Sequence, residues 1–490
     1  MGPSIACGHP LSARAALSVL RAGGNAFDGI GAACFASCAT EPMLTSLAGG
    51  GIGLLRFPSG DIKCIDFLTN FPKAFGAVDP LRTVVSFGDE TQIFFMGYGS
   101  LGVPGALAGL LHIHTRYGRL PLEQILAPAI DVARGHPLNR FQAYILRVLE
   151  RFCLHSREAR EVFAPRGRLL SEGDTIRNSK LAGFLETLAG DQAEALELYR
   201  EALSRTLSEK ESTLSLDDFD SYGVIEREPI RLAYRDHEIA LAPPPAVGGI
   251  LVAHALKLLE NCDLGHLRHN SAKHIETLVG AMQDCDSRRT RHFFDRVLYE
   301  DGFWKVSLKS PDRLGGTTHV SIIDQEGNAA GITTSNGQGA GIMVRDTGIM
   351  LNNFAAEPDL MQYRDVYRPG ERITSMMTPS MILRAAQLDA VLGSGGSNRI
   401  RSAILQAISN LVDFGMAAAE AVNRSRMHFE SGVLQLEHGI LPQVAQELSR
   451  KYRTNVWSDR NLFFGGVHLA SPLAAAGDRR RGGAAINPAA

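Results

Sequence analysis

The sequence predicts a mixed α/β sandwich, in which β-sheets are covered by layers of helices. Strand-like patterns occur near both ends of the chain, at 52–67 and from 317 onward, and a mostly helical stretch at 103–215 separates them. Helices packed on sheets bury the apolar face of each element, which favours this arrangement. At 490 residues the chain is longer than a usual single core, so two domains or one large layered unit is expected.

The first part of the chain is expected to form two helices and a hairpin. Apolar residues recur at helical spacing in 13–20 after a predicted Ser12 cap, and a second helix of small residues covers 28–39. Two strands, at 52–57 and 61–67, flank a Pro-Ser-Gly turn. These strands begin the first predicted sheet.

Strand patterns return after the helical stretch. The residues at 230–242 alternate as in strands, and a helix is expected at 250–258. The later elements are strands at 318–323, 329–335, 347–352 and 389–393 and helices near 400–413 and 416–423. The tail from Gly477 is poor in apolar residues and is expected to be disordered.

Composition and charge exclude several classes of function. Fifty Lys and Arg residues against 52 Asp and Glu residues give a net charge of −2, which provides no field for nucleic acid or an anionic membrane. The seven cysteines are scattered without a CxxC or Cys/His cluster, so neither a disulfide scaffold nor a metal site is expected, and no cofactor is implied. With no signal peptide or membrane span in the sequence, a cytoplasmic protein acting on a small molecule or peptide is expected.

Two glycine-rich stretches are candidates for binding an anion through backbone N–H groups. These are "AGGGIG" at 48–53 and "GSGGSNRI" at 393–400. Neither fits a Walker loop or a dinucleotide-binding motif, and such stretches are more often tight turns. The second lies between a predicted strand and a predicted helix, where N–H donors are placed to stabilise an oxyanion.

The junction "GGTTH" at 315–319 has two readings. An ordinary strand that begins with β-branched residues is the commoner explanation of such a pattern. Alternatively, cleavage between Gly316 and Thr317 gives Thr317 a free α-amine beside its hydroxyl, a nucleophile with its own base. A predicted hairpin turn at 325–328 places Thr333 and Ser335 on the partner strand, with hydroxyls that face Thr317. His319 lies on the same face and is interpreted as a half-buried histidine bonded to backbone.

Ordered motifs along nearly the whole chain resemble the γ-glutamyltranspeptidases. They include "LRAGGNAFDGIGAACFA", "LGVPGALAGLLHIHTRYGRLPLEQILAPAIDVARG", "APPPAVGG", "TTHVSIIDQEGN", "GIMLNN", "TPSMIL" and "GSGGSNRI". That family consists of N-terminal-nucleophile (Ntn) hydrolases that cleave themselves into two chains. The resemblance implies the four-layer αββα sandwich of Ntn hydrolases, with a large chain 1–316 and a small chain 317–490.

The resemblance also implies roles for individual residues. Thr317 is the expected nucleophile, released by cleavage after Gly316, and Ser335 is its supporting hydroxyl. Gly395 and Gly396 are the expected oxyanion donors. The expected substrate-binding residues are Asn336, Glu357, Ser375 and Thr333. The expected assembly is a heterodimer of the two cleaved chains, with a higher oligomer left open.

Three positions depart from the glutamyl pocket of the family. Leu68 replaces an arginine that binds the α-carboxylate, Met376 replaces the second serine of a pair, and Phe354 replaces a glutamine. A guanidinium–carboxylate contact is worth roughly 1.5 to 3 kcal/mol, and leucine supplies none of it. The expected function is a glutathione hydrolase/γ-glutamyltransferase activity. The alternatives are an acylase on a non-glutamyl amide, as in cephalosporin acylases, and an uncleaved, inactive scaffold protein.

Overall fold

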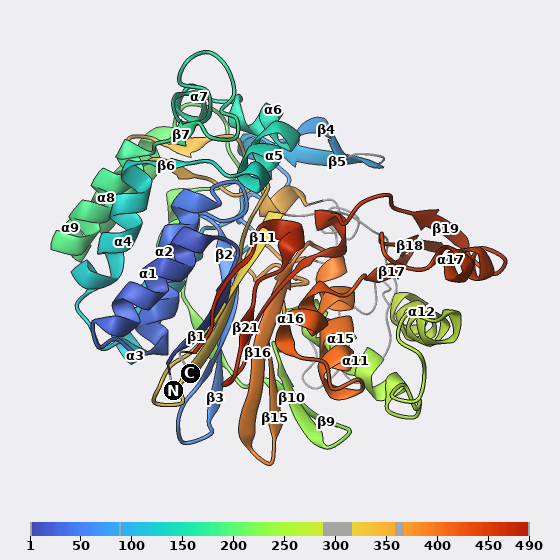
Figure 1. Cartoon of the computed structure of the whole chain (residues 1–490). Coiled ribbons are helices and arrows are strands. Elements are labelled where there is room, and N and C mark those ends of the chain that lie inside the picture. The colour runs from blue at the N-terminus through green and yellow to red at the C-terminus, as the bar shows by residue number, and fades with distance from the viewer. Residues whose placement is uncertain (1, 88–89, 288–315, 358–366, 489–490) are drawn as a thin grey trace.

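The computed structural model describes residues 2–87, 90–287, 316–357 and 367–488. Its centre is a pair of antiparallel sheets that face each other between two layers of helices (Figure 1). The αββα sandwich expected from the sequence is therefore confirmed. Both sheets combine strands from the first 316 residues with strands from the rest of the chain.

The first sheet has seven strands. In spatial order they are β22 (Ala484–Ile486), β1 (Ser4–Cys7), β11 (Gly316–Ile323), β12 (Ala329–Gly337), β2 (Gly50–Arg56), β3 (Ile62–Phe67) and β8 (Ile225–Arg227). The central strands β11 and β12 are buried along their whole length. They form the predicted hairpin, and the hairpin of β2 and β3 lies where the sequence placed it.

The second sheet has six strands. In spatial order they are β21 (Ala475–Ala476), β20 (Gly466–Ala470), β16 (Gln387–Gly395), β15 (Ser380–Arg384), β10 (His237–Leu241) and β9 (Ile230–Tyr234). Strands β16 and β20 face β11 across the space between the sheets. The start of β11 and the end of β16 therefore lie close together.

Helices from the first part of the chain lie outside the first sheet (Figure 1). The helices α1 (Pro10–Arg21), α2 (Ala26–Thr40) and α3 (Ala106–Tyr117) contact its strands. Farther out, α4 (Leu122–Arg134) packs on α2, and α8 (Ser179–Gly190) packs on α4 and on α9 (Gln192–Leu207). Helix α2 is buried on every side, and a capping box between Asn25 and Asp28 fixes its start. Gly29 lets it approach β11, because a Cβ there would lie 3.4 Å from Ile322 and 3.1 Å from Leu20 of α1.

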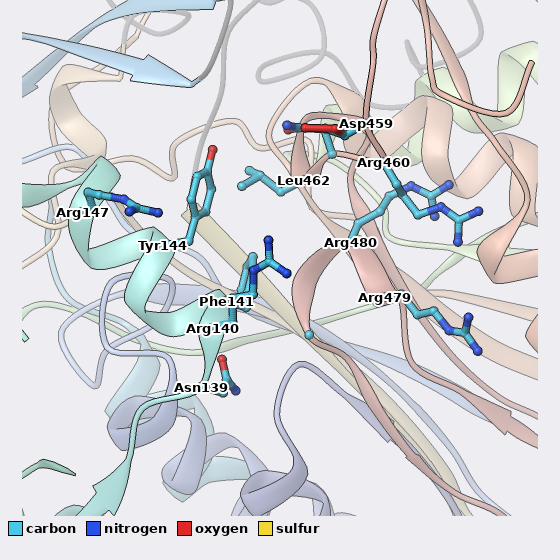
Figure 2. A pocket seen from close by; sticks show the side chains of 12 residues that line it. Asn139, Arg140, Phe141, Tyr144, Arg147, Asp459, Arg460, Leu462, Arg479 and Arg480 are labelled. Carbon is cyan, nitrogen blue, oxygen red and sulfur yellow. The ribbon is translucent and has the colours of Figure 1, made fainter. Parts of the chain in front are cut away.

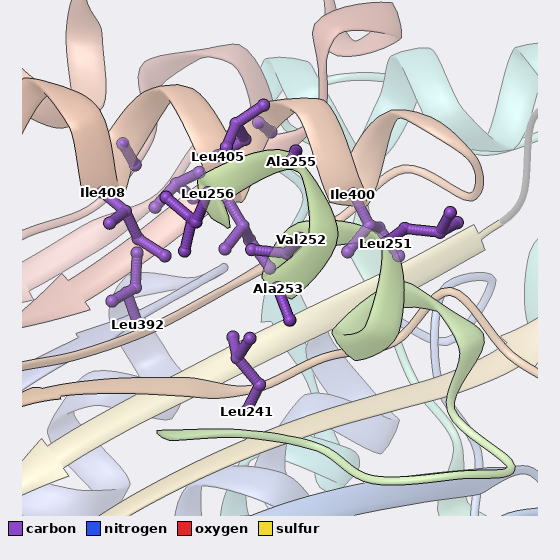
Figure 3. Close-up of a cluster of buried hydrophobic side chains, with 14 of the residues drawn as sticks. Leu241, Leu251, Val252, Ala253, Ala255, Leu256, Leu392, Ile400, Leu405 and Ile408 are labelled. Carbon is purple, nitrogen blue, oxygen red and sulfur yellow. The ribbon is translucent and has the colours of Figure 1, made fainter. Parts of the chain in front are cut away.

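The second sheet is covered by α11 (Val247–Leu259), α12 (Ala272–Ser287), α15 (Arg399–Val412) and α16 (Ala418–Asn423). Figure 3 shows how the core of this half is built: Leu241 and Leu392 of the sheet lie under apolar side chains of α11 and α15. The α11 residues Leu251, Val252 and Leu256 are at most 1% exposed. Burial of such side chains stabilises the layer by roughly 1.5 to 3 kcal/mol each.

Smaller elements surround the sandwich. Near the end of the sheets where β11 begins lie α5 (Arg140–Val148), α6 (Glu150–Cys153), α7 (Arg157–Phe163) and the hairpins β4 (Leu81–Phe87) with β5 (Glu90–Met96) and β6 (His136–Pro137) with β7 (Thr175–Ile176). The remaining elements are β13 (Met343–Val344), β14 (Ile349–Met350), α10 (Leu216–Asp220), β17 (Met427–Glu430), β18 (Val433–Leu436), α17 (Pro442–Leu448) and β19 (Arg453–Val456), with 3-10 turns η1 (Tyr98–Ser100), η3 (Phe354–Ala356), η4 (Leu462–Phe464) and η5 (Arg479–Arg481).

The predicted disorder of the tail from Gly477 is wrong for the described residues 477–488. Strand β22 pairs with β1 at the edge of the first sheet, and Arg480 is buried in ion pairs with Glu437 and Asp478. A polar sequence rich in arginine and glycine is therefore ordered by specific pairing rather than by apolar packing. Two smaller expectations also change: the strand at 347–352 shortens to β14, and His9 rather than Ser12 caps α1.

Candidate active site

Thr317 lies at the start of β11, opposite Ser335 of β12. The two residues are cross-strand partners, and the Thr317 hydroxyl donates to the Ser335 hydroxyl over 3.4 Å. Both side chains are buried. The register shifts between Gly316 and Thr317, so the ladder is irregular at the peptide bond predicted to be cleaved. The hairpin turn at 325–328 placed both Thr333 and Ser335 on the partner strand, and the observed register makes Ser335 the direct partner of Thr317.

Gly316 is closely surrounded by other backbone atoms. A Cβ at this position would collide with the carbonyl oxygen of Gly337 and lie 2.9 Å from that of Met43. Glycine is therefore the residue that fits here. The Ser335 hydroxyl donates to the Gly316 carbonyl oxygen and accepts from the Gly337 N–H over 3.0 Å. Ser335 thus polarises the carbonyl group of Gly316, the residue directly before Thr317.

The predicted oxyanion loop lies on the other side of Thr317. Gly395 ends β16, and a Cβ on it would collide with the Thr317 carbonyl oxygen. Gly396 follows with φ +127°, in the region that favours glycine, and α15 begins at Arg399. The structure therefore brings Gly395 and Gly396 beside Thr317, at the end of a strand and the beginning of a helix.

Arg481 is a residue that the sequence interpretation missed. Its Nη1 donates to the Thr317 carbonyl oxygen over 3.0 Å, and its side chain is buried beside Gly395. Burial lowers the pKa of the guanidinium to about 10, which leaves it charged at neutral pH. Its Nε and Nη2 have no hydrogen-bond partner among the described residues. The arginine comes from the tail expected to be disordered, so no sequence signal connected it with Thr317.

Glu41 is a second missed residue, buried behind the neighbouring Thr318. The Thr318 hydroxyl donates to the Glu41 carboxylate over 3.1 Å. Burial raises the pKa of this carboxyl to about 7, although the Thr318 hydrogen bond and the charge of Arg481 act in the opposite direction. A glutamate just after a helix of small residues gives no signal of this contact in the sequence.

His319 and Thr333 form a separate pair. His319 is fully buried, and its Nδ1 and Nε2 lie 2.8 Å from the hydroxyls of Thr333 and Ser321. The predicted half-buried histidine bonded to backbone is therefore wrong in both respects. Burial lowers the pKa of His319 well below its usual range. The prediction that the Thr333 hydroxyl faces Thr317 is also wrong, because Thr333 is the cross-strand partner of His319.

Asn336 follows Ser335 in β12, and Glu357 lies near Gly337 at the end of that strand. The Asn336 Nδ2 donates to the carbonyls of Met350 and Leu351 over 3.4 Å, and its buried Oδ1 has no partner among the described residues. A Cβ on Gly337 would lie 3.4 Å from a carboxylate oxygen of Glu357. An amide next to Ser335 and an acid near Gly337 therefore lie close to Thr317's partner strand, and their role in substrate binding stays a prediction.

The other predicted head-group positions are apolar or occupied by local contacts. Leu68 is fully buried, and Phe354 is 3% exposed. The Ser375 hydroxyl accepts from the Met377 N–H over 3.1 Å, and the Ser375 backbone pairs with Ala246 just before α11. No contact among the described residues joins Ser375 to Thr317.

Arg372 is the guanidinium near Leu68, but the protein's own groups hold it. Its Nε lies 3.2 Å from an Asp66 carboxylate oxygen, and its guanidinium carbon lies 4.5 Å from the ring centre of Tyr222. The Tyr222 hydroxyl in turn donates to the Leu68 carbonyl over 2.8 Å. Arg372 is thus part of a buried structural network and does not replace the arginine that the family places after "DF".

No helix in the described residues is both long and apolar enough to cross a membrane. Within the same residues, no group of three or more His, Cys, Asp or Glu side chains is arranged to hold a metal ion.

One known protein family has a sequence model that matches nearly the whole chain. The sequence model described as Gamma-glutamyltranspeptidase matches residues 12–300 and 299–487. The chain belongs to the γ-glutamyltranspeptidase family. It is therefore an enzyme of this family, and the assignment made from the sequence motifs is confirmed.

Relatives of this γ-glutamyltranspeptidase family member include a protein named acylase and a protein named glutathione hydrolase. The Acylase ACY 1 proenzyme of Pseudomonas sp. (strain V22) is 31% identical over 92% of this chain and 87% of its own length. The Glutathione hydrolase proenzyme of Escherichia coli (strain K12) is 28% identical over 89% of this chain and 82% of its own. The crystal structure of cephalosporin acylase from Bacillus halodurans shares the fold, with a TM-score of 0.83, 22% identity and coverage of 99% of this chain and 95% of that one.

Proposed function

We propose that this family member is a self-processing amidohydrolase and acyltransferase with Thr317 as its N-terminal nucleophile. The observation that carries the proposal is the contact chain at β11, in which the Thr317 hydroxyl bonds to Ser335 and the Ser335 hydroxyl bonds to the Gly316 carbonyl. The Thr317 hydroxyl therefore lies beside the Gly316 carbonyl, and the Ser335 hydroxyl polarises that carbonyl.

In processing, the Thr317 Oγ attacks the Gly316 carbonyl carbon, and the bond from that carbon to the Thr317 nitrogen breaks. The product is an ester between Gly316 and the Thr317 Oγ, with a free α-amine on Thr317. Water then hydrolyses the ester, which leaves chains 1–316 and 317–490. Both sheets contain strands from each chain, so the two chains are expected to stay together as a heterodimer.

In turnover, the Thr317 Oγ attacks a substrate amide carbonyl while the α-amine of Thr317 accepts its proton. The backbone N–H groups of Gly395 and Gly396 are proposed to bind the oxyanion, because their loop lies against Thr317. The α-amine returns the proton to the leaving amine. Water or an acceptor amine then takes the acyl group from Thr317.

A γ-glutamyl amide such as glutathione is the first proposed substrate. The relative named glutathione hydrolase supports it, as do Asn336 next to Ser335 and Glu357 near Gly337. Chemically, Glu357 suits the α-amine of a glutamyl group, since a carboxylate pairs with an ammonium ion.

A non-glutamyl acyl amide is the second proposed substrate, and a specific observation favours it. Leu68 and Phe354 are buried apolar side chains at positions where the family binds the charged head of an amino acid. A relative named Acylase ACY 1 proenzyme also supports an acyl amide as substrate. An apolar pocket accepts a chain without the full zwitterionic head more readily.

Trapping of the acyl-enzyme tests the proposed mechanism independently of the preferred substrate. The protein is mixed with γ-glutamyl, glutaryl and fatty-acyl amides and quenched in acid, and the 317–490 chain is weighed by mass spectrometry. The expected result is a gain of one acyl mass, located on the peptide that begins at Thr317. Amide hydrolysis with the acyl group on another residue would contradict the proposal, and loss of all turnover would support the scaffold alternative.

A further inference from the structure

A large open pocket lies between α5 and the C-terminal part of the chain. It encloses about 910 Å³ and is lined by residues from three segments, 139–147, 459–462 and 479–482. Figure 2 shows Arg140, Tyr144 and Arg147 on the α5 side, with Arg460 and Arg479 on the opposite side. The volume is in the range of ligand-binding pockets. None of the residues assigned to the Thr317 site lines it.

The charges around this pocket are unbalanced. Four exposed arginines line it, and none of them forms an ion pair with a described residue: Arg140, Arg147, Arg460 and Arg479. Asp459 is the acidic residue of the lining. Exposed Arg119 and Arg200, in contrast, are paired with Glu326 and Asp220. In a protein of net charge −2, a hollow lined by more arginines than acidic residues concentrates positive potential.

Buried contacts hold the walls of the pocket in place. The Glu437 carboxylate accepts from the guanidinium of Arg480 and from the Asn461 backbone N–H, so it joins two of the three segments. A capping box between Asn139 and Gln142 fixes the start of α5. Binding groups mounted on a fixed scaffold lose less entropy when a ligand is bound.

We propose that this pocket binds a small anion with two or more carboxylate or phosphate groups, held by Arg140, Arg147, Arg460 and Arg479. Guanidinium groups bind both kinds of oxyanion in a bidentate manner, and several around one hollow favour multiple charges over one. Phe141, Tyr144 and Leu462 add an apolar wall that suits an organic carbon skeleton. The site is distinct from the catalytic one, although Arg479 and Arg481 belong to the same turn, η5.

Calorimetric titration of the purified protein at low ionic strength tests the proposal. Citrate serves as the polycarboxylate, pyrophosphate as the polyphosphate and acetate as the single-charge comparison. Saturable binding of citrate or pyrophosphate, tighter than that of acetate, is expected, and the better anion identifies the source of the ligand. The double variant Arg140→Gln/Arg479→Gln and the single variant Arg460→Gln should each raise the Kd, the double variant at least tenfold.

Arg450→Gln is the matched control, since Arg450 is exposed and lies outside the pocket. It should leave the Kd unchanged. The substituted pocket arginines are exposed, so the variants should keep the wild-type Tm, which is measured in parallel without ligand. The proposal is overturned if neither anion saturates the protein below about 10 mM, a very weak affinity. It is also overturned if the pocket variants bind as tightly as Arg450→Gln does.

Discussion

Polar groups bond to Thr317 on several sides, whereas the corresponding position in the head-group segment is the apolar side chain of Leu68. At Thr317, the hydroxyl, the carbonyl and the preceding carbonyl are each bonded to a polar group, from Ser335 or Arg481. At Leu68, the side chain is apolar and fully buried, and the nearby guanidinium of Arg372 is held by Asp66. The polar contacts that chemistry needs are present, whereas those that hold a zwitterionic head are partly missing.

This difference indicates that the reaction and its substrate preference depend on separate parts of the chain. The reacting side lies on the central strands β11 and β16, where a change of register would displace every partner. The head-group side lies on segments that connect the strands, where a substitution alters contacts without moving the nucleophile. The predictions below test each side separately.

The largest effect is expected from Thr317→Ala. This variant should remain uncut and show no amide turnover, because processing and catalysis both need the Thr317 Oγ. Thr317→Ser is the matched control and should retain part of both activities, since it keeps a hydroxyl. Gel analysis and an anilide assay measure the two effects. Cleavage after Gly316 in the alanine variant would contradict the assigned nucleophile.

Ser335→Ala should lower kcat/KM by roughly ten- to a thousandfold, the range for losing a hydrogen bond that acts in the transition state. Processing should slow as well, because the Gly316 carbonyl loses its donor. Thr333→Ala is the comparison: it removes a hydroxyl from the same strand that contacts His319 instead. Equal losses of activity in the two variants would mean that the effect is structural and not specific to Thr317.

The head-group positions around Leu68 are tested with γ-glutamyl, glutaryl and fatty-acyl anilides, which are expected to differ in KM. The missing guanidinium contact is worth roughly 1.5 to 3 kcal/mol, or about ten- to a hundredfold in kcat/KM. The γ-glutamyl compound should therefore have a raised KM, and a compound without the full head should be turned over better. A micromolar KM for the γ-glutamyl anilide would show that Glu357 and Asn336 are sufficient to hold the head group.

The smallest effect concerns Glu41 and pH. Its pKa is about 7 in the folded protein and near 4.5 when unfolded, so the folded state binds the proton more tightly. Protonation of Glu41 therefore stabilises the folded state below pH 4.5, and this stabilisation is lost as the pH rises through 7. Glu41→Gln should therefore show a smaller fall in Tm between pH 5 and 8 than the wild type, by a few degrees. Exposed Glu123 gives the control, Glu123→Gln; the same pH profile in all three proteins would contradict the role of Glu41.

Two parts of the candidate site could be predicted from local sequence patterns. The hairpin turn at 325–328 placed Ser335 on the strand that pairs with Thr317, and glycines between a strand and a helix marked the loop at Gly395. The turn alone did not distinguish Thr333 from Ser335, because both side chains lie on one face of β12 and each residue has only one direct cross-strand partner.

The rest depends on contacts between segments far apart in the chain. Arg481 reaches Thr317 from a tail whose composition resembles disorder, and Glu41 reaches Thr318 from the end of α2. Neither contact has a periodicity or motif, since both arise only when the two sheets and their helices pack. The pairing of Arg480 with Glu437, which orders that tail, is equally invisible in the local sequence.

The central claim is that the peptide bond between Gly316 and Thr317 breaks without another protein. Intact-mass measurement of the purified wild-type protein over several days tests it most directly. The account predicts two species, with the masses of residues 1–316 and 317–490, that elute together on size exclusion because they share both sheets. One stable species with the mass of the uncut chain would contradict it, as would cleavage at any other bond.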